Sequence, residues 1–303
     1  MKRLIAAGIM LAGAAAAAGW IAAAPEPRSA ASLAAHEADA ENGKRLFTAS
    51  GCQSCHLPGK DDKDADKSLP SGGHELVTPA GTFYPPNITP ERETGIGGWS
   101  DIEFINAMKL GISPDGQHYL PAFPYTSYAH MSDADVLDIK AYMDTLTPVK
   151  AQNKAPELPL GLPVETIMRR GLGVWKMAAF EPKEFTPDPS RDEVWNRGAY
   201  LVTGPGHCAE CHTPRDIFMG LDESRWLAGG PHPEGKGSVP SLRALKERGR
   251  YKDAKDLATA LEFGETLGYD KMSSGGMGAV QTNMSKLPAE DRIAIATYLM
   301  SLD

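Results

Sequence analysis

The sequence predicts an all-α protein made of two tandem helical domains, and three observations support that prediction. A five-residue motif, Cys-x-x-Cys-His, occurs twice, at Cys52–His56 and at Cys208–His212. Segments with helical spacing of apolar residues surround each copy, whereas nothing resembles a strand-rich domain. With 303 residues and 42% hydrophobic composition, the chain is long enough to bury two modest cores.

The first residues are typical of an export signal. Lys2 and Arg3 precede an uncharged run from Leu4 to Ala24, which is long enough to cross a bilayer as a helix. Trp20, near the far end of this run, suits a membrane interface. We interpret residues 1–38 as an uncleaved anchor helix followed by a tether.

A cleaved signal is the alternative to an anchor. The small residues Ala22–Ala24 are followed by Pro25, which signal peptidase tolerates poorly, but Ser29–Ala31 offers a later cleavage site. Either way, the rest of the chain is expected on the non-cytoplasmic side of the membrane.

The first predicted domain covers residues 39–147. A helix at Glu41–Phe47 leads into the first motif. A middle helix is predicted at Trp99–Met108, because a serine that can cap it is followed three residues later by a glutamate. The last helix of this domain is predicted at Asp133–Leu146.

Residues 148–189 form the predicted connection between the domains. This stretch is rich in proline, but Glu165–Phe180 contains an apolar set that fits a short docked helix. We therefore expect a semi-rigid strap packed on the domains, which would fix the distance between them.

The second predicted domain, residues 190–303, repeats the first. Its helices are predicted at Trp195–Val202, Tyr251–Gly264 and Ala289–Leu302. The interval from Cys52 to Cys208 recurs between matching residues of the two last helices, namely Asp135 and Asp291, Tyr142 and Tyr298, and Leu146 and Leu302. This internal repeat predicts two cores of the same kind.

The chemistry of the motif points to haem. Its two thiols stand one helical turn apart and can add to the two vinyl groups of one haem, while the adjoining histidine reaches the iron. We therefore predict two covalently bound haem c groups. The expected attachment residues are Cys52, Cys55, Cys208 and Cys211, and the expected proximal iron ligands are His56 and His212.

Two other uses of paired cysteines remain as alternatives. A zinc site would need further cysteine or histidine ligands at finger or ribbon spacing. A redox dithiol would not need the adjoining histidine. All four cysteines of the chain lie in the two motifs, and both copies carry the histidine.

These motifs and five longer stretches resemble a known family over about residues 40 to 303. The stretches are Phe83–Pro90, Gly95–Ser100, Pro121–Tyr125, Gly206–Arg215 and Leu287–Arg292. Together they look like tandem class I cytochrome c domains, similar to the dihaem and trihaem cytochrome c subunits of periplasmic alcohol, aldehyde and sugar dehydrogenases. The resemblance implies electron transfer and a partner dehydrogenase subunit.

The sixth iron ligand of the second haem is predicted to be Met277. The candidates are Met272, Met277 and Met284. Met277 follows two glycines on a stretch expected to be a loop ahead of the last helix, where the backbone can approach a haem face. It also matches the pattern that the resemblance implies.

The sixth ligand of the first haem is predicted to be Met131, at the start of the last helix of the first domain. In the related alcohol dehydrogenase subunits a methionine follows Pro-Ala, but here that place is taken by Phe123. The alternatives are Met108, Met143, His118 and His130.

The predicted function is that of a periplasmic dihaem cytochrome, tethered to the inner membrane through its N-terminal helix. It would relay electrons from a partner dehydrogenase to a downstream acceptor of the respiratory chain, and no catalytic residue is predicted. A net charge of -8 argues against nucleic-acid binding. The alternative is an enzyme, such as a dihaem peroxidase that uses an open or displaceable first haem.

Overall fold

The computed structural model describes residues 10, 13–14, 16–78, 81–158, 162–232, 237–266, 270–271 and 276–303. The described part is mostly helical, as expected. The longer helices are α2 (Ala40–Ala49), α4 (Asp101–Leu110), α6 (Asp133–Asp144), α7 (Leu162–Ala179), α8 (Glu193–Thr203), α10 (Ala254–Phe263), α11 (Gly276–Met284) and α12 (Ala289–Met300).

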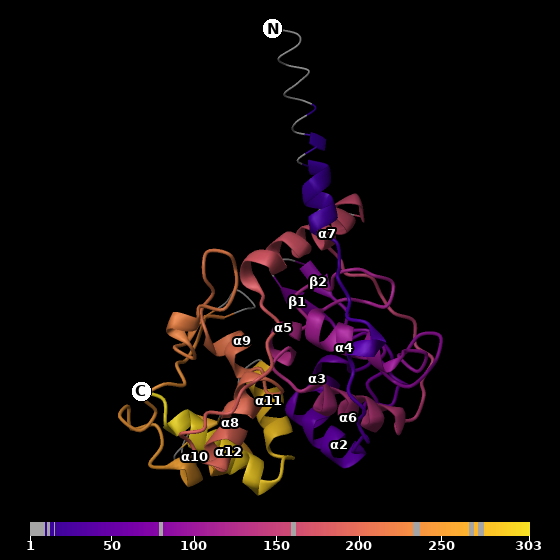
Figure 1. Cartoon of the computed structure of the whole chain (residues 1–303). Helices are drawn as coiled ribbons and strands as arrows, with labels where there is room; N and C mark the ends of the chain where they lie inside the picture. Colours follow the sequence, from indigo (N-terminus) through magenta and orange to yellow (C-terminus); the bar gives the residue numbers. More distant parts are fainter. Residues whose placement is uncertain are drawn as a thin grey trace.

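Short elements fill the connections. The short helical turns are η1 (Ala30–Ser32), α3 (Cys52–Cys55), α5 (Tyr125–Tyr128), α9 (Cys208–His212) and η2 (Glu223–Arg225). Three antiparallel ribbons pair β1 (Leu76–Thr78) with β2 (Gly81–Phe83), β3 (Gly230–Pro231) with β4 (Ser238–Val239), and β5 (Glu265–Thr266) with β6 (Asp270–Lys271). In Figure 1, α2 to α6 lie beside α8 to α12, with α7 above them.

Each half of the molecule contains one closely packed helix pair, α2 with α6 and α8 with α12, and in each pair a glycine allows the helices to touch. A methyl group on Gly43 of α2 would stand 1.8 Å from the carbonyl oxygen of Asp138 on α6. A methyl group on Gly198 of α8 would stand 1.9 Å from the carbonyl oxygen of Ala294 on α12. Glycine is required at both positions, because any side chain would push the helices apart.

An aromatic pair fills the gap beside each crossing. Phe47 meets Tyr142 edge to face, with ring centroids 5.2 Å apart, and Trp195 meets Tyr298 at 5.1 Å. The two tyrosines are separated by the repeat interval, whereas their partners Phe47 and Trp195 stand at different places relative to Gly43 and Gly198. The internal repeat is therefore visible as two similarly packed helix pairs.

The middle helix α4 begins as predicted. The Ser100 backbone N–H donates to the Glu103 carboxylate at 2.7 Å, which completes a capping box. In the second half, the Asp253 side chain caps α10 by accepting from the Asp256 N–H at 2.9 Å. Both helices end in a glycine with a left-handed backbone, Gly111 and Gly264 respectively.

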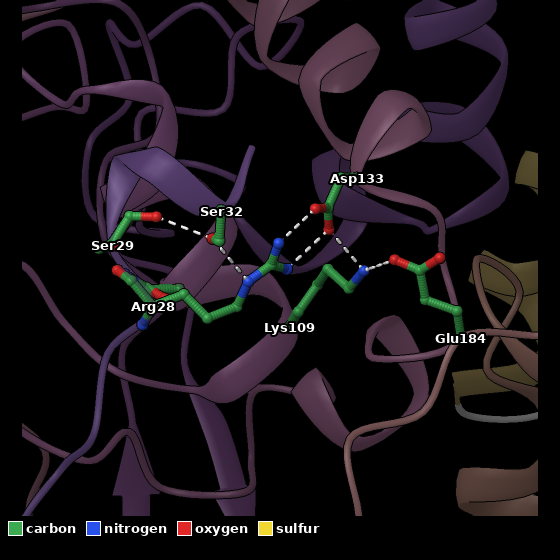
Figure 2. Close-up of polar contacts among 7 residues, drawn as sticks. Arg28, Ser29, Ser32, Lys109, Asp133 and Glu184 are labelled. Carbon is green, nitrogen blue, oxygen red and sulfur yellow. Dashed lines mark hydrogen bonds and ion pairs between the residues drawn. The ribbon is translucent and has the colours of Figure 1, made fainter. Parts of the chain in front are cut away.

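The stretch before α2 is tied to the body by charged groups (Figure 2). Arg28 donates two hydrogen bonds to Asp133, at 2.9 and 2.6 Å. Lys109 of α4 donates to Asp133 at 2.6 Å and also to Glu184, which lies after α7. Burial alone would raise the pKa of Asp133, but hydrogen bonds from Arg28 and Lys109 outweigh it and lower that pKa to about 2. The segment predicted to be a tether is thus clamped to the N-terminal half.

The predicted anchor lies partly outside the described residues, because these omit residues 1–9, 11–12 and 15. Residues 16–22 are helical and stand away from the body in Figure 1. Within the ranges given above, no helix combines the length and the hydropathy needed to cross a membrane. The anchor stays a prediction.

Candidate haem sites

The first motif is a single helical turn that begins at an unusual backbone position. Gly51, just before α3, has φ 63° and ψ 20°, a left-handed conformation that glycine adopts without strain. This turn starts α3 directly at Cys52 and leaves Cys55 exposed. Burial raises the pKa of the Cys52 thiol to about 12.

His56 follows this turn, and its ring is held by one backbone carbonyl. Nδ1 lies 2.7 Å from the carbonyl oxygen of Pro86. Because a carbonyl can only accept, Nδ1 must carry the proton, and the lone pair stays on Nε2. Burial lowers the pKa of His56 to about 4, despite the opposing effect of the Pro86 hydrogen bond. The ring is therefore neutral at pH 7, in the form that binds iron through Nε2.

The second motif repeats this arrangement. His212 Nδ1 lies 2.7 Å from the carbonyl oxygen of Pro240, so Nδ1 is again the donor and Nε2 keeps its lone pair. Burial also lowers the pKa of His212. Cys208 is half-buried and Cys211 is exposed, as in the first motif. The two predicted proximal ligands thus share one hydrogen-bonding pattern.

A glycine packs against the backbone of each of these prolines and donates a hydrogen bond to the carbonyl of the motif histidine. The Gly72 N–H donates to the carbonyl of His56 at 2.9 Å, and a methyl group on Gly72 would stand 2.4 Å from the Pro86 carbonyl carbon. In the second half, the Gly229 N–H donates to the carbonyl of His212 at 2.7 Å. Gly72 and Gly229 have φ values of 79° and 77°, so both positions favour glycine.

The two motifs lie against each other through the residues just before them. His207 Nε2 lies 3.2 Å from the carbonyl oxygen of Ser50, so His207 donates across from the second half to the first. The Tyr128 hydroxyl donates to the same carbonyl at 3.1 Å, and its ring meets the His207 ring edge to face at 5.8 Å. His207 directly precedes the second motif, and Ser50 lies two residues before the first cysteine of the first motif.

The third residue of each motif also contacts the opposite half. In the first motif, Ser54 Oγ lies 2.8 Å from the Asn283 side-chain nitrogen, which donates to it from α11. In the second motif, Glu210 accepts hydrogen bonds from Thr126 at 2.6 Å and from Ser127 at 2.8 Å, both on α5. The motifs themselves therefore contribute to the joint between the halves, alongside contacts such as that of the Tyr200 hydroxyl with Asp135.

Glu210 is held as a carboxylate in this joint. Arg215 Nη2 donates to it at 2.6 Å, and the Glu210 side chain is 13% exposed. Burial alone would raise the pKa of Glu210, but the charge of Arg215 and the hydrogen bonds lower it. Glu210 thus stays ionised and joins the second motif to α5.

The two predicted sixth ligands, Met131 and Met277, differ in burial and in local structure. Met131 is fully buried between α5 and α6, and a methyl group on Gly204 would stand 3.4 Å from its Cγ. Met277 is half-buried in the first turn of α11, so the loop that we expected there is helical from Gly276 onward. This helix forms because it packs on α10 and contacts α2, which outweighs its two glycines.

The other candidates for the sixth positions are placed as follows. Met272 lies outside the described residues. Met284, Met108 and Met143 are buried among apolar side chains. His118 is buried, with Nε2 donating to the carbonyl of Ala23 at 3.1 Å. The assignments of Met131 and Met277 stay predictions.

The donor sets fit a covalently held haem. Each motif offers two sulfurs within one helical turn and a neutral histidine whose lone pair is on Nε2. The carbonyls of Pro86 and Pro240 are not among the groups predicted from the sequence. A shared signal was present, because each of these prolines is followed by a polar and then an aliphatic residue.

Comparison with known proteins agrees with this chemistry. Residues 40–147 match the family model described as cytochrome c. The chain is 43% identical to a diheme cytochrome c-type protein of Cereibacter sphaeroides, over 99% of this chain and 98% of that protein.

Two further relatives belong to dehydrogenases. The chain is 39% identical to a subunit of the nicotinate dehydrogenase of Pseudomonas putida, over 87% of this chain and 21% of that protein. It is 34% identical to the fructose dehydrogenase cytochrome subunit of Gluconobacter japonicus, over 91% of this chain and 55% of that subunit. The chain thus spans only part of both. These matches confirm the resemblance drawn from the motifs, and the chain belongs to the cytochrome c family.

Proposed function

We propose that this cytochrome is a two-haem electron carrier on the periplasmic side of the inner membrane. It takes electrons from a dehydrogenase and passes them toward the respiratory chain, and it is not itself the catalytic subunit. The main support is the matched pair His56 and His212, each with Nδ1 bonded to a proline carbonyl at 2.7 Å. A bound haem c supplies a one-electron Fe(III)/Fe(II) couple.

Each part of the chain has a role in this proposal. Residues 39–147 and 190–303 are two class I cytochrome c domains, residues 148–189 are the strap between them, and residues 1–38 are the anchor and tether. The similarly packed helix pairs around Gly43 and Gly198 support the two domains. Support for two haems comes from the two motifs and from the diheme relative.

The chain itself orients the haem ligands and fixes the distance between the two sites. The carbonyls of Pro86 and Pro240 hold the histidine rings and increase the basicity of Nε2. The contacts of His207 with Ser50 and of Glu210 with α5 keep the two motifs in one arrangement. A fixed separation suits a relay, because electron transfer is steeply sensitive to distance.

The dehydrogenase partner is supported by the relatives. A cytochrome subunit of fructose dehydrogenase shares 34% identity over 91% of this chain, and cytochrome c subunits of quinone alcohol dehydrogenases are also similar. We therefore propose a dehydrogenase as electron donor. The quinone-dependent alcohol dehydrogenases are the class to try first.

The first experiment counts haems and their ligands. Covalent haem per chain, measured on purified protein, should be two, and the double variants Cys52→Ala/Cys55→Ala and Cys208→Ala/Cys211→Ala should each retain one. The weak far-red band of iron–methionine ligation should amount to two equivalents. Met131→Ala and Met277→Ala should each remove one; a variant that leaves the band intact shows that its assignment is wrong.

The second experiment tests the relay. A quinone-dependent alcohol dehydrogenase with its substrate should reduce both haems anaerobically in a stopped-flow instrument, and a respiratory cytochrome oxidase preparation should then reoxidise them. Turnover of hydrogen peroxide by the purified chain, lost in Cys52→Ala/Cys55→Ala, would instead support the peroxidase alternative.

A further inference from the structure

The outward face of α7 is apolar, which is the reverse of an ordinary surface helix. From residue 167 to residue 178, the exposed positions of α7 carry only apolar side chains or glycine, including Ile167, Val174 and Met177. These three side chains are 62%, 51% and 64% exposed. A surface helix normally turns such residues to the core and its charged residues to water.

Two of the three cationic residues of α7 are directed into the protein, and the third, Arg170, packs on the N-terminal helix. Lys176 donates to the carbonyls of Leu110 and Gly111, at 2.5 and 3.0 Å, at the C-terminal end of α4. Arg169 donates to the carbonyl of His118 at 3.1 Å. Because Lys176 and Arg169 bind backbone carbonyls on the inner face, the outer face of α7 over residues 167–178 is left without charged side chains.

A loop beside α7 extends this apolar surface. Residues 217–219 are three consecutive large apolar residues, Ile217, Phe218 and Met219, which are 90%, 56% and 67% exposed. The Trp175 ring N–H donates to the carbonyl of Phe218 at 2.8 Å, which joins the loop to α7. We call Ile167, Val174, Met177, Ile217, Phe218 and Met219 the apolar platform.

The platform is continuous with the N-terminal apolar run. A methyl group on Gly173 of α7 would stand 2.2 Å from the carbonyl oxygen of Ala23, so the two backbones touch. Arg170 of α7 lies 5.1 Å from the centre of the Trp20 ring. Figure 1 shows α7 crossing the base of the N-terminal helix.

Exposed apolar residues are concentrated here. Among the described residues, every exposed large apolar side chain except Val77, Val194 and Phe263 lies on the N-terminal helix, on α7 or on the loop 217–219. Contiguous patches of this kind mark sites that contact a membrane or another protein.

We propose that the apolar platform rests on the lipid surface into which the N-terminal run inserts. This inference depends on the membrane tether of the proposed function. Lipid is favoured over a protein partner because α7 lies where the apolar run leaves the body, at the depth of Trp20, and because a helix with one apolar face can lie in a membrane interface. The platform would hold the two haem halves at one orientation to the membrane.

The test uses the full haem-loaded chain in vesicles of phosphatidylethanolamine and phosphatidylglycerol. A nitroxide label is attached to Met177→Cys or Phe218→Cys, while the native cysteines are blocked by their thioether bonds. The control is Lys255→Cys on α10, an exposed position outside the platform. Collisions of each label are measured with oxygen, which concentrates in lipid, and with a water-soluble nickel chelate.

The labels at positions 177 and 218 should show a ratio of oxygen to chelate collisions several-fold above that at position 255. Val174→Glu should lower the ratio at position 177, whereas Val194→Glu, at an exposed site on α8, should not. Ratios equal to that of the control, in chains that stay in the vesicles after an alkaline wash, would overturn the platform but leave the tether. Loss of the chain in that wash would overturn the tether, and the platform with it.

Discussion

The two haem motifs are both short helical turns, but they differ in the residue that precedes the first cysteine. Gly51 and His207 occupy equivalent positions, and both have left-handed backbones, with φ values of 63° and 38°. Glycine adopts this conformation without strain, whereas a histidine there costs about 1–2 kcal/mol. His207 is held in place by its hydrogen bond to Ser50 and its ring contact with Tyr128. The backbone strain at His207 is thus offset by contacts of its side chain with the first half, which a glycine at this position could not make.

The largest loss of stability is expected from adding a methyl group where the two helices of each pair touch. The two halves should respond alike to this change. Gly43→Ala and Gly198→Ala should each destabilise the protein by about 3 kcal/mol, because the added methyl group would overlap a backbone carbonyl. Thermal unfolding followed at the haem absorption band measures the loss. Gly171→Ala is the control, since nothing lies within 4 Å of its added methyl group. A variant as stable as this control would contradict the observed crossing.

The third motif residues provide the next comparison. Glu210→Ala should cost about 2–3 kcal/mol, because it removes a buried carboxylate with three partners and leaves Arg215 without its counter-charge. Ser54→Ala should cost only about 1 kcal/mol, since it removes one neutral hydrogen bond. Denaturant unfolding compares the two variants. Equal losses would mean that the joint does not depend on the Glu210 charge.

Acid should affect the N-terminal half through Asp133. Because the folded pKa of Asp133 is lowered to about 2, its stabilisation is present above its ordinary pKa of 3.8 and is lost as pH falls toward 2. We expect a loss of about 1–2 kcal/mol in the free energy of unfolding over this range. Asp133→Asn should flatten this pH dependence, whereas Asp64→Asn, at an exposed position, should not. An unchanged slope in Asp133→Asn would contradict the clamp in Figure 2.

The smallest effect on stability is expected from replacing His207, the residue before the second motif, by the glycine found at the equivalent position 51. His207→Gly relieves backbone strain but removes the hydrogen bond to Ser50, so the free energy of unfolding should change by less than about 1 kcal/mol. The rate of electron exchange between the haems should fall, because the direct contact between the motifs is gone. Flash photoreduction of one haem measures that rate, with Gly171→Ala, whose added methyl group has no neighbour within 4 Å, as the control. An unchanged rate would show that this contact is not part of the route.

The features that sequence predicts best here are local or repeated. Cys-x-x-Cys-His, the capping box at Ser100 and the paired last helices each have a signal within a few residues or at the repeat interval. The hydrogen bond of His56 to Pro86 has only the weak repeated signal described above, and that of Glu210 to Thr126 has none, since each joins residues from separate segments. A helix was expected at Glu165–Phe180 and α7 is present there, but the exposure of Ile167 and Val174 depends on packing between segments and has no local signal.

The placement of Ser54 and Glu210 between the cysteines predicted to attach haem has a consequence for biogenesis. Only the cysteines and the histidine are needed for attachment, so the intervening positions can carry contacts between the halves. Those contacts require each motif to be folded as a helical turn. If both motifs carry haem, as proposed, a chain that has received only one haem is expected to have a weakened joint as well as a missing centre.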